Sequence, residues 1–502
     1  MPSPGLGARI TELLLGRITA RIERLRREPG DLQDEAARRL AGAFAKTAFG
    51  RAHDLASVRD ARSLSVRVPL REYDELAPFF ERPLYWGMTS GTAGIRKSIP
   101  VTRGLLDASK RGMQLAVGGA LAARRDVSPL LGKTIYIGAS EPLRLRDDGV
   151  PSGVITAVAV HDLSPLARAS LLPGTALDHV VGWTAKLDAL VDMSRHADVR
   201  MISGMPPWLL AFAERIERTL GVRELRELWP NLALAVHAGA SPEPYREELR
   251  ARFGPIRFRN VYTATEGFFA FQDTDDDEAG LLPVADDVVF ELVPISELRS
   301  RRPIRVLLAD AEPDIDYALV CSTWAGLFGY VLGDTVRVVS RAPTRIVLSG
   351  RVHARLNVTG EQVGASEIEG AMAAASRSLA VAIREAAVVA LGPGPHGRAH
   401  HVWLVELEER DPRALPPTDL TELARVLDTE LAARAPQYRV RRQGDPAPLD
   451  PPTIRVVSPG GFRAWLEGSG KIGGQHKVPR VLEAVPDALA RAIVREAWPR
   501  PR

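Results

Sequence analysis

Residues 199–204 read VRMISG, and a helical pattern from Pro207 to Leu220 and a second apolar run, LALAVHAGAS at 232–241, follow them. Each apolar run has the length of a buried strand and ends in glycine or serine. A strand, a helix and a second strand in this order are typical of α/β folds. The stretch therefore predicts an α/β domain.

The same alternation extends over residues 130–350. Further strands are predicted at Lys133 to Ser140 (KTIYIGAS) and Phe258 to Gly267 (FRNVYTATEG), and a helix is predicted from Pro242 to Phe253, with proline in its first turn. Sheets of this class bind ligands at the carboxyl ends of their strands. The polar residues that end these runs are therefore candidates for a binding site.

From about residue 288 the pattern changes to strands without helices between them, which predicts an antiparallel subdomain: Val288 to Val293, Tyr317 to Ser322, Thr335 to Val339 and Arg345 to Leu348. The sequence SGRVH at Ser349 to His353 interrupts this pattern. A helix from Ser366 to Ala375 and a strand from Val402 to Leu407 follow it. Because 502 residues exceed one compact core, we expect two domains, 1–349 and 350–502.

Composition excludes several classes of protein. The 66 basic and 62 acidic residues leave a formal charge of only +4. A nucleic-acid-binding protein is expected to have a basic patch interleaved with stacking aromatics, and the sequence contains none. One cysteine, Cys321, excludes an intramolecular disulfide and fits a cytoplasmic protein. The amphipathic stretch from Ile10 to Leu25 is expected to pack on its own domain, and no apolar run or signal pattern predicts a membrane segment.

The stretch WGMTSGTAGIRKSIP at residues 86–100 has the residue types of a phosphate-binding loop. Its glycines let backbone N–H groups curl toward an anion, and its hydroxyls and one ammonium add donors: Thr89, Ser90, Gly91, Thr92, Gly94 and Lys97. It does not fit a Walker A loop. Only seven of the 66 basic residues are lysine, which favours a specific use for Lys97 as a point charge.

Two later motifs offer the other groups that a nucleotide needs. In Tyr262 to Gly267 (YTATEG), Glu266 follows a predicted strand and could hold Mg²⁺ between phosphate oxygens. In Tyr330 to Asp334 (YVLGD), a glycine precedes a carboxylate that suits two vicinal ribose hydroxyls. Each motif alone is also compatible with an ordinary turn.

The order of the three motifs, TSGTAGxxK, YxxTE and YxxGD, resembles the adenylate-forming enzymes, and among them the acyl-acid amido synthetases of the auxin-responsive Gretchen Hagen family. Supporting stretches lie at Val68 to Arg82, Gly204 to Trp208, Pro244 to Arg246 and Gly474 to Arg480. The resemblance covers residue 65 to the C-terminus. It implies a large N-terminal α/β domain with a β-subdomain, and a smaller, mobile α+β C-terminal domain.

The resemblance also implies roles for single residues. Ser90, Gly91, Thr92, Gly94 and Lys97 would surround the ATP phosphates, Tyr262 would lie against adenine, Thr265 would touch the α-phosphate, Glu266 would hold Mg²⁺, Asp334 would bind the ribose, and Arg351 would lie at the hinge. The family usually has serine where Thr265 stands, which preserves a hydroxyl. It usually has arginine where Val331 stands, so that guanidinium is missing.

Near the C-terminus, the glycine-rich stretch GSGKIGGQHKVPR at 468–480 contains two candidates for a catalytic lysine, Lys471 and Lys477. Mobile glycine-rich loops suit an ammonium that must enter and leave a cleft. SGKI is similar to the lysine motif of acyl-CoA synthetases, whereas QHKVPR is similar to the amido synthetases. We favour Lys477.

The resemblance implies that ATP and Mg²⁺ convert a carboxylic acid to acyl-AMP, and that an amine, expected to be an amino acid, then displaces AMP to give an amide. An acyl-CoA ligase and a non-catalytic protein that binds ATP and an acid remain alternatives. Arg103 and Arg111 are candidates for binding the acid. The acidic run DTDDDE at Asp273 to Glu278 is predicted to be a solvated loop, and Cys321 a buried, inert thiol.

Overall fold

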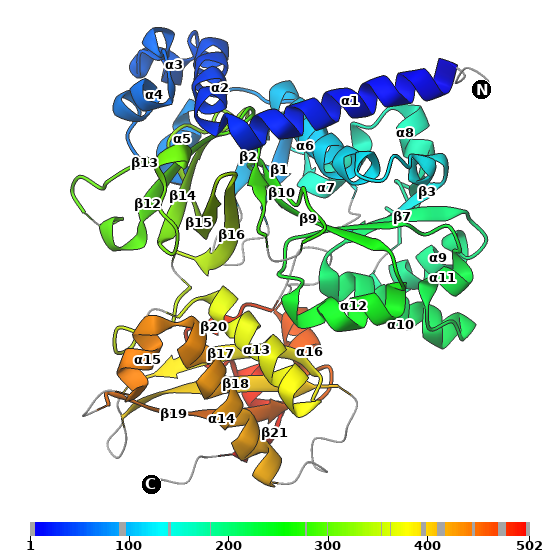
Figure 1. The fold of residues 1–502 in the computed structure, drawn as a ribbon, viewed down its shortest axis with the longest axis vertical. Coiled ribbons are helices and arrows are strands. Elements are labelled where there is room, and N and C mark those ends of the chain that lie inside the picture. The colour runs from blue at the N-terminus through cyan, green and yellow to red at the C-terminus, as the bar shows by residue number, and fades with distance from the viewer. Residues whose placement is uncertain are drawn as a thin grey trace. The chain divides into compact units, whose positions relative to one another are not determined.

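The computed structural model describes residues 6–89, 97–138, 142–180, 182–276, 279–298, 300–352, 354–361, 363–392, 398–408, 417–443, 447–469 and 478–497 (Figure 1). The chain divides into two compact units. The first contains Met1–Ala240 and Glu248–Val347, and the second contains Ser241–Glu247 and Leu348–Arg502. The short segment Ser241–Glu247 thus leaves the first unit in the middle of its sequence and joins the second.

The first unit is built on a seven-stranded sheet with the strand order β11-β10-β9-β8-β7-β3-β6. Its strands are β3 (Lys133–Ile137), β6 (Leu171–Leu172), β7 (Val199–Gly204), β8 (Leu234–Ala238), β9 (Arg257–Ala264), β10 (Gly267–Phe271) and β11 (Leu282–Pro283). Strands β6, β3, β7, β8 and β9 run parallel, and β10 and β11 continue the sheet antiparallel. Helix α10 (Pro206–Leu220) lies between β7 and β8 in sequence, which confirms the predicted strand, helix and strand.

A second sheet of the first unit presents the predicted phosphate loop. It has the strand order β2-β1-β5-β4, from β1 (Tyr85–Met88), β2 (Ser98–Val101), β4 (Arg144–Leu145) and β5 (Pro151–Val154). Strands β1 and β2 pair antiparallel, with Met88 opposite Ser98. The loop therefore connects two hydrogen-bonded strands.

A third sheet of the first unit is the predicted β-subdomain. Its order is β13-β12-β14-β15-β16, from β12 (Val289–Pro294), β13 (Val306–Leu307), β14 (Asp316–Ser322), β15 (Tyr330–Arg341) and β16 (Thr344–Arg351). Strand β12 pairs antiparallel with β13 and β14, and β14 pairs antiparallel with β15. The predicted antiparallel character is confirmed, although β15 begins five residues before the expected strand.

The N-terminal helix packs on the first unit, as expected. Helix α1 (Leu6–Arg27) lies against α6 (Arg103–Ala122), where two glycines permit a close approach. A Cβ on Gly118 or Gly119 would come within 2.5 Å and 2.8 Å of Ile18 and Ile22 respectively. None of the described helices combines the length and the apolar character needed to cross a bilayer.

Shorter helices complete the first unit: α2 (Pro29–Phe44), α3 (Ala48–Ala52), α4 (Ala61–Arg67), α5 (Tyr73–Leu76), α7 (Ile155–His161), α8 (Pro165–Ala169), α9 (Trp183–Ser194), α11 (Leu225–Leu228) and α12 (Arg246–Phe253).

The acidic run after β10 is exposed at Asp275 and Asp276, as its composition predicts, but its first residue is not. The Asp273 side chain is fully buried, and its Oδ2 lies 2.7 Å from Nε of Arg26 and 3.1 Å from Nη2 of Arg345. Because a buried carboxylate needs charged partners, Asp273 joins α1 and β16 to the loop between them. The burial of Asp273 could not be predicted from the sequence, because its partners Arg26 and Arg345 are far from it along the chain.

The second unit is a five-stranded sheet with helices on both faces (yellow to red in Figure 1). Its order is β20-β17-β18-β19-β21, from β17 (Ile383–Leu391), β18 (Ala399–Leu407), β19 (Leu449–Val457), β20 (Val481–Leu482) and β21 (Ile493–Ala497). On β18, Trp403 and Val405 belong to one apolar cluster and Val402 and Leu404 to another, as the alternation of a strand requires. The first cluster includes residues of α13 (Ala365–Leu379), α14 (Pro417–Arg434) and α15 (Pro436–Gln443), and the second includes residues of α16 (Gly461–Gly468) and α17 (Asp487–Arg491).

A buried arginine explains why Ser241–Glu247 belongs to the second unit. Arg480 lies 2.6 Å from Glu385 on β17 and 3.1 Å from Glu369 on α13. Its Nη2 donates a 2.9 Å hydrogen bond to the hydroxyl of Tyr245, which itself donates to Glu385. The tyrosine completes the polar partners of a guanidinium that is 7% exposed.

Substitution of Gly112 tests the packing of α6 on the seven-stranded sheet. A Cβ there would overlap the ring of Phe268 on β10, whereas a Cβ on the exposed Gly42 of α2 would meet nothing within 4 Å. Overpacking costs about 1–3 kcal/mol, so we expect Gly112→Ala to lower the midpoint of urea unfolding. Gly42→Ala should leave it unchanged or raise it, since alanine is the better helix former by about 0.5–1 kcal/mol. Equal midpoints for both variants would contradict this close packing.

Candidate active site

The hairpin of β1 and β2 holds both ends of the predicted phosphate loop. The backbone N–H of Thr89 donates a 3.0 Å hydrogen bond to the carbonyl of Lys97, and the N–H of Lys97 donates to Oγ1 of Thr89 at 3.0 Å. Thr89 therefore closes the loop with both its backbone and its side chain. Ser90, Gly91, Thr92 and Gly94 lie outside the described residues.

The ammonium of Lys97 contacts the first residue of the third motif. Its Nζ donates a 3.0 Å hydrogen bond to the hydroxyl of Tyr330, at the start of β15. The ring centre of Tyr330 is 5.5 Å from Nζ. We attribute this distance to the hydrogen bond with the hydroxyl, which lies at the edge of the ring, and not to a contact with the face of the ring. Within the described part of the chain, no carboxylate forms an ion pair with Lys97. Its charge is thus held by a neutral group.

The third motif also contacts the second. The hydroxyl of Tyr262 donates a 2.7 Å hydrogen bond to Oδ2 of Asp334, and both residues are buried. Tyr262 is on β9, and Asp334 lies four residues after Tyr330 on β15. Two hydrogen bonds, one between Lys97 and Tyr330 and one between Tyr262 and Asp334, therefore meet on strand β15, and we call these four residues the linked group.

Thr265 and Glu266 form the tight turn between β9 and β10, and both are buried. A Cβ on Gly87 of β1 would come within 2.6 Å of the Thr265 methyl group. The absence of a side chain at Gly87 thus lets the strand before the phosphate loop lie directly against the second motif.

The lone cysteine is influenced by carboxylates of two of these motifs. Burial, and then the charges of Glu266 and Asp334, raise the pKa of the Cys321 thiol well above its ordinary value. Cys321 lies opposite Tyr330 in the pairing of β14 with β15. The thiol stays protonated at neutral pH, as expected of an inert residue, and it lies beneath the site rather than acting in it.

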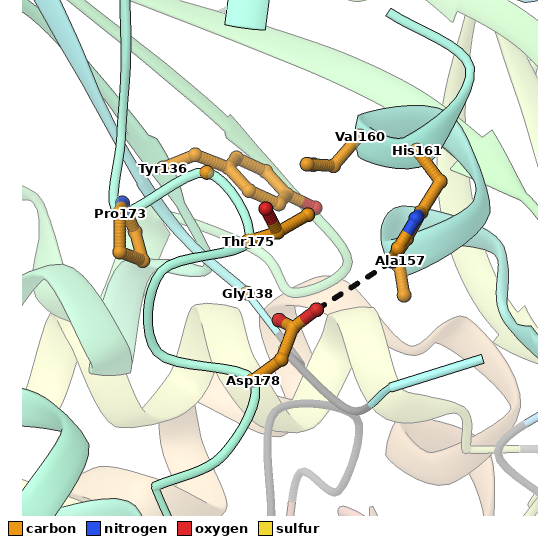
Figure 2. Close-up of a pocket in the computed structure, with 9 residues that line it drawn as sticks. Tyr136, Gly138, Ala157, Val160, His161, Pro173, Thr175 and Asp178 are labelled. Carbon is orange, nitrogen blue, oxygen red and sulfur yellow. Dashed lines mark ion pairs between the residues drawn. The ribbon is translucent and has the colours of Figure 1, made fainter. Parts of the chain in front are cut away.

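The first unit also has a small pocket beside helix α7 (Figure 2). It is lined by Tyr136 and Gly138 at the end of β3, by Ala157, Val160 and His161 of α7, and by Pro173, Gly174, Thr175 and Asp178 after β6. His161 Nε2 lies 3.5 Å from Asp178 Oδ2, as Figure 2 shows. Burial raises the pKa of Tyr136 to about 12, opposed by a hydrogen bond with Thr156. The lining combines an imidazole, a carboxylate and two hydroxyls.

The pocket and the second motif lie at the same edge of the seven-stranded sheet. Gly138 follows β3, and Thr265 and Glu266 follow β9, which runs parallel to it with β7 and β8 between them. Three strand spacings separate these two strands by about 14 Å. This edge is where parallel sheets bind ligands.

Arg103 and Arg111, the candidates for binding the acid, both have carboxylate partners. Arg103 lies 3.0 Å from Asp162, and the Lys110 ammonium lies 2.6 Å from the same carboxylate. Burial opposes ionisation of Asp162, but its hydrogen bonds with Lys110 and Arg103 lower its pKa. Arg111 makes two hydrogen bonds to Asp287, of 2.6 Å and 3.0 Å. These pairs favour a structural role for both arginines.

The remaining predicted residues belong to the second unit. Arg351 ends β16 and forms a β-bridge with Ala354. Lys471 and Lys477 lie outside the described residues.

Sequence reasoning missed two residues that shape the site, Gly87 and Tyr73. Gly87 stands in the phosphate-loop stretch, where attention fell on the hydroxyls, the later glycines and Lys97, and Tyr73 stands in a stretch that was recognised only for its resemblance. The signal that could have found Gly87 is a glycine inside a short strand, which marks a close approach of another segment. Tyr73 begins a helix of four residues, too short to show a periodic pattern.

Comparison with known families matches three stretches of the chain to one family. The GH3 family N-terminal domain matches residues 18–170, the GH3 family central domain matches residues 281–351, and the GH3 family C-terminal domain matches residues 366–485. Together the matches take in more than half of the chain, in the order of the family's own domains.

Curated relatives match part of the chain. The Arabidopsis thaliana protein "Indole-3-acetic acid-amido synthetase GH3.4" is 30% identical over 192 residues, which are 36% of this chain and 31% of that protein. The matched stretches cover between 31% and 61% of the length of such relatives, so the chain spans less than two thirds of the curated proteins it matches.

Solved structures show the fold over nearly all of the chain. The structure "AtGH3.15 acyl acid amido synthetase in complex with 2,4-DB" superposes with a TM-score of 0.79 at 16% identity, covering 100% of this chain and 99% of that one. A 2-hydroxyisobutyryl-CoA ligase in its postadenylation state gives a TM-score of 0.61 at 15% identity, covering 92% of each chain. The fold is that of the adenylate-forming enzymes, as the motifs indicated, and the chain belongs to the GH3 family.

Proposed function

We propose that this protein uses ATP to activate a carboxylic acid as acyl-AMP and then transfers the acyl group to an amine, forming an amide. The observation that carries the proposal is the linked group of Lys97, Tyr330, Asp334 and Tyr262, with Glu266 and Thr265 at the adjoining turn. These residues supply an ammonium for phosphate, carboxylates for Mg²⁺ and ribose, and a hydroxyl for the α-phosphate.

The chemistry accounts for this set of groups. A carboxylate oxygen attacks the α-phosphorus of ATP, the bond to the bridging oxygen breaks, and pyrophosphate leaves. The acyl carbon now bears AMP, a good leaving group. The amine nitrogen then attacks this carbon and loses a proton, and AMP departs. Negative charge shifts between oxygens in the first step, so fixed cations stabilise its transition state.

We assign Mg²⁺ to Glu266. Mg²⁺ is commonly bound by one or two carboxylates together with substrate phosphates, and the buried carboxylate of Glu266 at the ligand-binding edge of the sheet fits this pattern. Bound there, the ion would neutralise phosphate charge. The Thr265 hydroxyl would meet the α-phosphate and Asp334 the ribose. Ser90, Gly91, Thr92 and Gly94 for the phosphates, Arg351 for the hinge and Lys477 as the catalytic lysine are assigned from the family resemblance alone.

The pocket lined by His161 is a better candidate for the acid than Arg103 or Arg111. Both arginines already neutralise carboxylates, whereas the pocket is lined by Gly138, which lies at the sheet edge that carries Glu266. An acid with its carboxylate near Thr265 could extend along this edge toward His161. The imidazole and hydroxyls there would favour an acid with a hydrogen-bonding group at its far end.

The named relatives suggest the class of both substrates. They are indole-3-acetic acid-amido synthetases, and the solved structure holds 2,4-DB. We therefore expect an organic acid and an amino acid here. A protein that consumes ATP and keeps one buried, reduced cysteine fits the cytoplasm.

Exchange of labelled pyrophosphate into ATP tests the first step. With pooled carboxylic acids and Mg²⁺, the native protein should give acid-dependent exchange. We expect Glu266→Gln, which removes the charge but keeps the shape, to lower the rate by about 10²–10³-fold, as loss of a transition-state charge contact does. Glu312→Gln, at an exposed position before β14, is the control and should exchange normally. Undiminished exchange in Glu266→Gln would exclude the proposed role of this residue.

The acceptor separates the amide-forming reaction from an acyl-CoA ligase. When acid and ATP are present, pooled amino acids should accelerate AMP release and yield an amide, detected by mass spectrometry. Coenzyme A should give no thioester. Thioester without amide would favour the ligase, and ATP binding without pyrophosphate release would favour a non-catalytic binding protein.

The pocket assignment predicts altered selectivity when its imidazole is removed. We expect His161→Leu to lower kcat/KM by about tenfold for acids with a distal hydroxyl or carbonyl, roughly the worth of one hydrogen bond, and less for apolar acids of equal length. The KM for ATP should not change. A uniform loss for all acids would argue against direct contact with the acid.

A further inference from the structure

Tyr73 is tied to the strand that carries the partner of Lys97. The N–H of Arg71, two residues before Tyr73, donates a 2.8 Å hydrogen bond to the carbonyl of Gly329, and the N–H of Val331 donates to the carbonyl of Arg71 at 2.9 Å. These two bonds enclose Tyr330 in a parallel bridge. Tyr73 and Tyr330 are therefore fixed relative to each other by backbone, not by side chains alone.

The hydroxyl of Tyr73 holds the backbone next to Lys97. Strand β2 is an edge strand, so one side of its backbone has no strand partner. The Tyr73 hydroxyl donates a 3.0 Å hydrogen bond to the carbonyl of Ser98 and accepts a 3.1 Å hydrogen bond from the N–H of the same residue. One hydroxyl thus satisfies both backbone groups of Ser98 and fixes the main chain directly after the phosphate loop.

The ring of Tyr73 faces the lysine itself. The Lys97 Nζ lies 5.6 Å from the ring centre, within the range of cation–π attraction, and the Tyr73 hydroxyl is already engaged by Ser98. The Tyr330 hydroxyl holds the same Nζ at 3.0 Å. Two aromatic residues therefore orient the ammonium and leave its charge uncompensated by any ion pair in the described part of the chain.

We propose that Tyr73 is a positioning residue for adenylation, which holds the Lys97 ammonium ready for phosphate through its ring and its hydroxyl. The proposal rests on the proposed function. A lysine on four rotatable bonds loses conformational freedom when it meets a ligand, and an environment that orders it beforehand reduces that cost. Neutral partners suit the task, because a carboxylate would compete with the phosphate.

Three substitutions separate the two contacts. Tyr73→Phe removes the hydroxyl and keeps the ring, and Tyr73→Leu removes both. Tyr85→Phe is the matched control, since Tyr85 lies on the hairpin of β1 and β2 that holds Lys97, and its side chain makes no hydrogen bond with a described residue. We expect Tyr73→Phe to lower kcat for pyrophosphate exchange by about tenfold, Tyr73→Leu to lower it further, and Tyr85→Phe to leave it unchanged. Unchanged kcat in Tyr73→Leu would overturn the proposal.

A double-mutant cycle distinguishes positioning from general support of the fold. In a Lys97→Met background, Tyr73→Phe should have little further effect on the residual exchange rate, because the group that it positions is gone. Additive losses in the double variant would show that Tyr73 acts on the fold independently of Lys97, and the proposal would be wrong.

A third measurement does not depend on activity. The rate at which an amine-acylating reagent modifies Lys97, followed by mass spectrometry with the exposed Lys46 as internal reference, should rise severalfold in Tyr73→Phe and Tyr73→Leu. Equal rates in native and variant proteins would overturn the positioning proposal. If the native protein shows no acid-dependent exchange while the Lys97 rates differ, the proposed function fails and the contact between Tyr73 and Lys97 stands.

Discussion

The site depends on how one ammonium is held. Lys97 comes from the four-stranded sheet, its partner Tyr330 from the five-stranded sheet, and Tyr330 is followed on the same strand by Asp334, which accepts a hydrogen bond from Tyr262 of the seven-stranded sheet. Three sheets of the first unit are therefore joined by two hydrogen bonds, both of which end on strand β15. The cation, the carboxylate and the aromatic ring of the site thus come from three different sheets.

The charges elsewhere in the first unit make Lys97 stand out. Lys110 lies against Asp162, Arg111 against Asp287, and Asp273 is enclosed by two arginines. In each case a buried or half-buried charge is neutralised by an opposite one, as the cost of desolvation requires. Lys97 instead has a phenol and an aromatic ring. A cation with neutral neighbours retains its attraction for an anion, which is the physical property that a phosphate site needs.

Much of the fold followed from sequence because its signals are local. The strand and helix around Val199 and Pro207, the antiparallel strands after residue 288 and the amphipathic N-terminal helix each show their period within one element. The order of three short motifs indicated the family. What sequence did not show depends on partners far along the chain: the burial of Asp273 by Arg26 and Arg345, the ion pairs of Arg103 and Arg111, and the contact of Gly87 with Thr265. The contact of Gly87 with Thr265 also shows what surrounds the threonine that replaces the family's usual serine. The extra methyl group of Thr265 lies where a side chain on residue 87 would be.

The placement of Ser241–Glu247 determines which fragment of the chain contains the whole second unit. Because the chain passes between the units three times, after residues 240, 247 and 347, the second unit is not one continuous piece of sequence. A fragment that starts at Leu348 would lack Tyr245 and leave Nη2 of the buried Arg480 without its hydroxyl partner. The same bond constrains movement: a rotation of the second unit must either carry this segment along or break it away from Arg480. The C-terminal unit is thus complete only with a short loop that sequence order assigns to its neighbour.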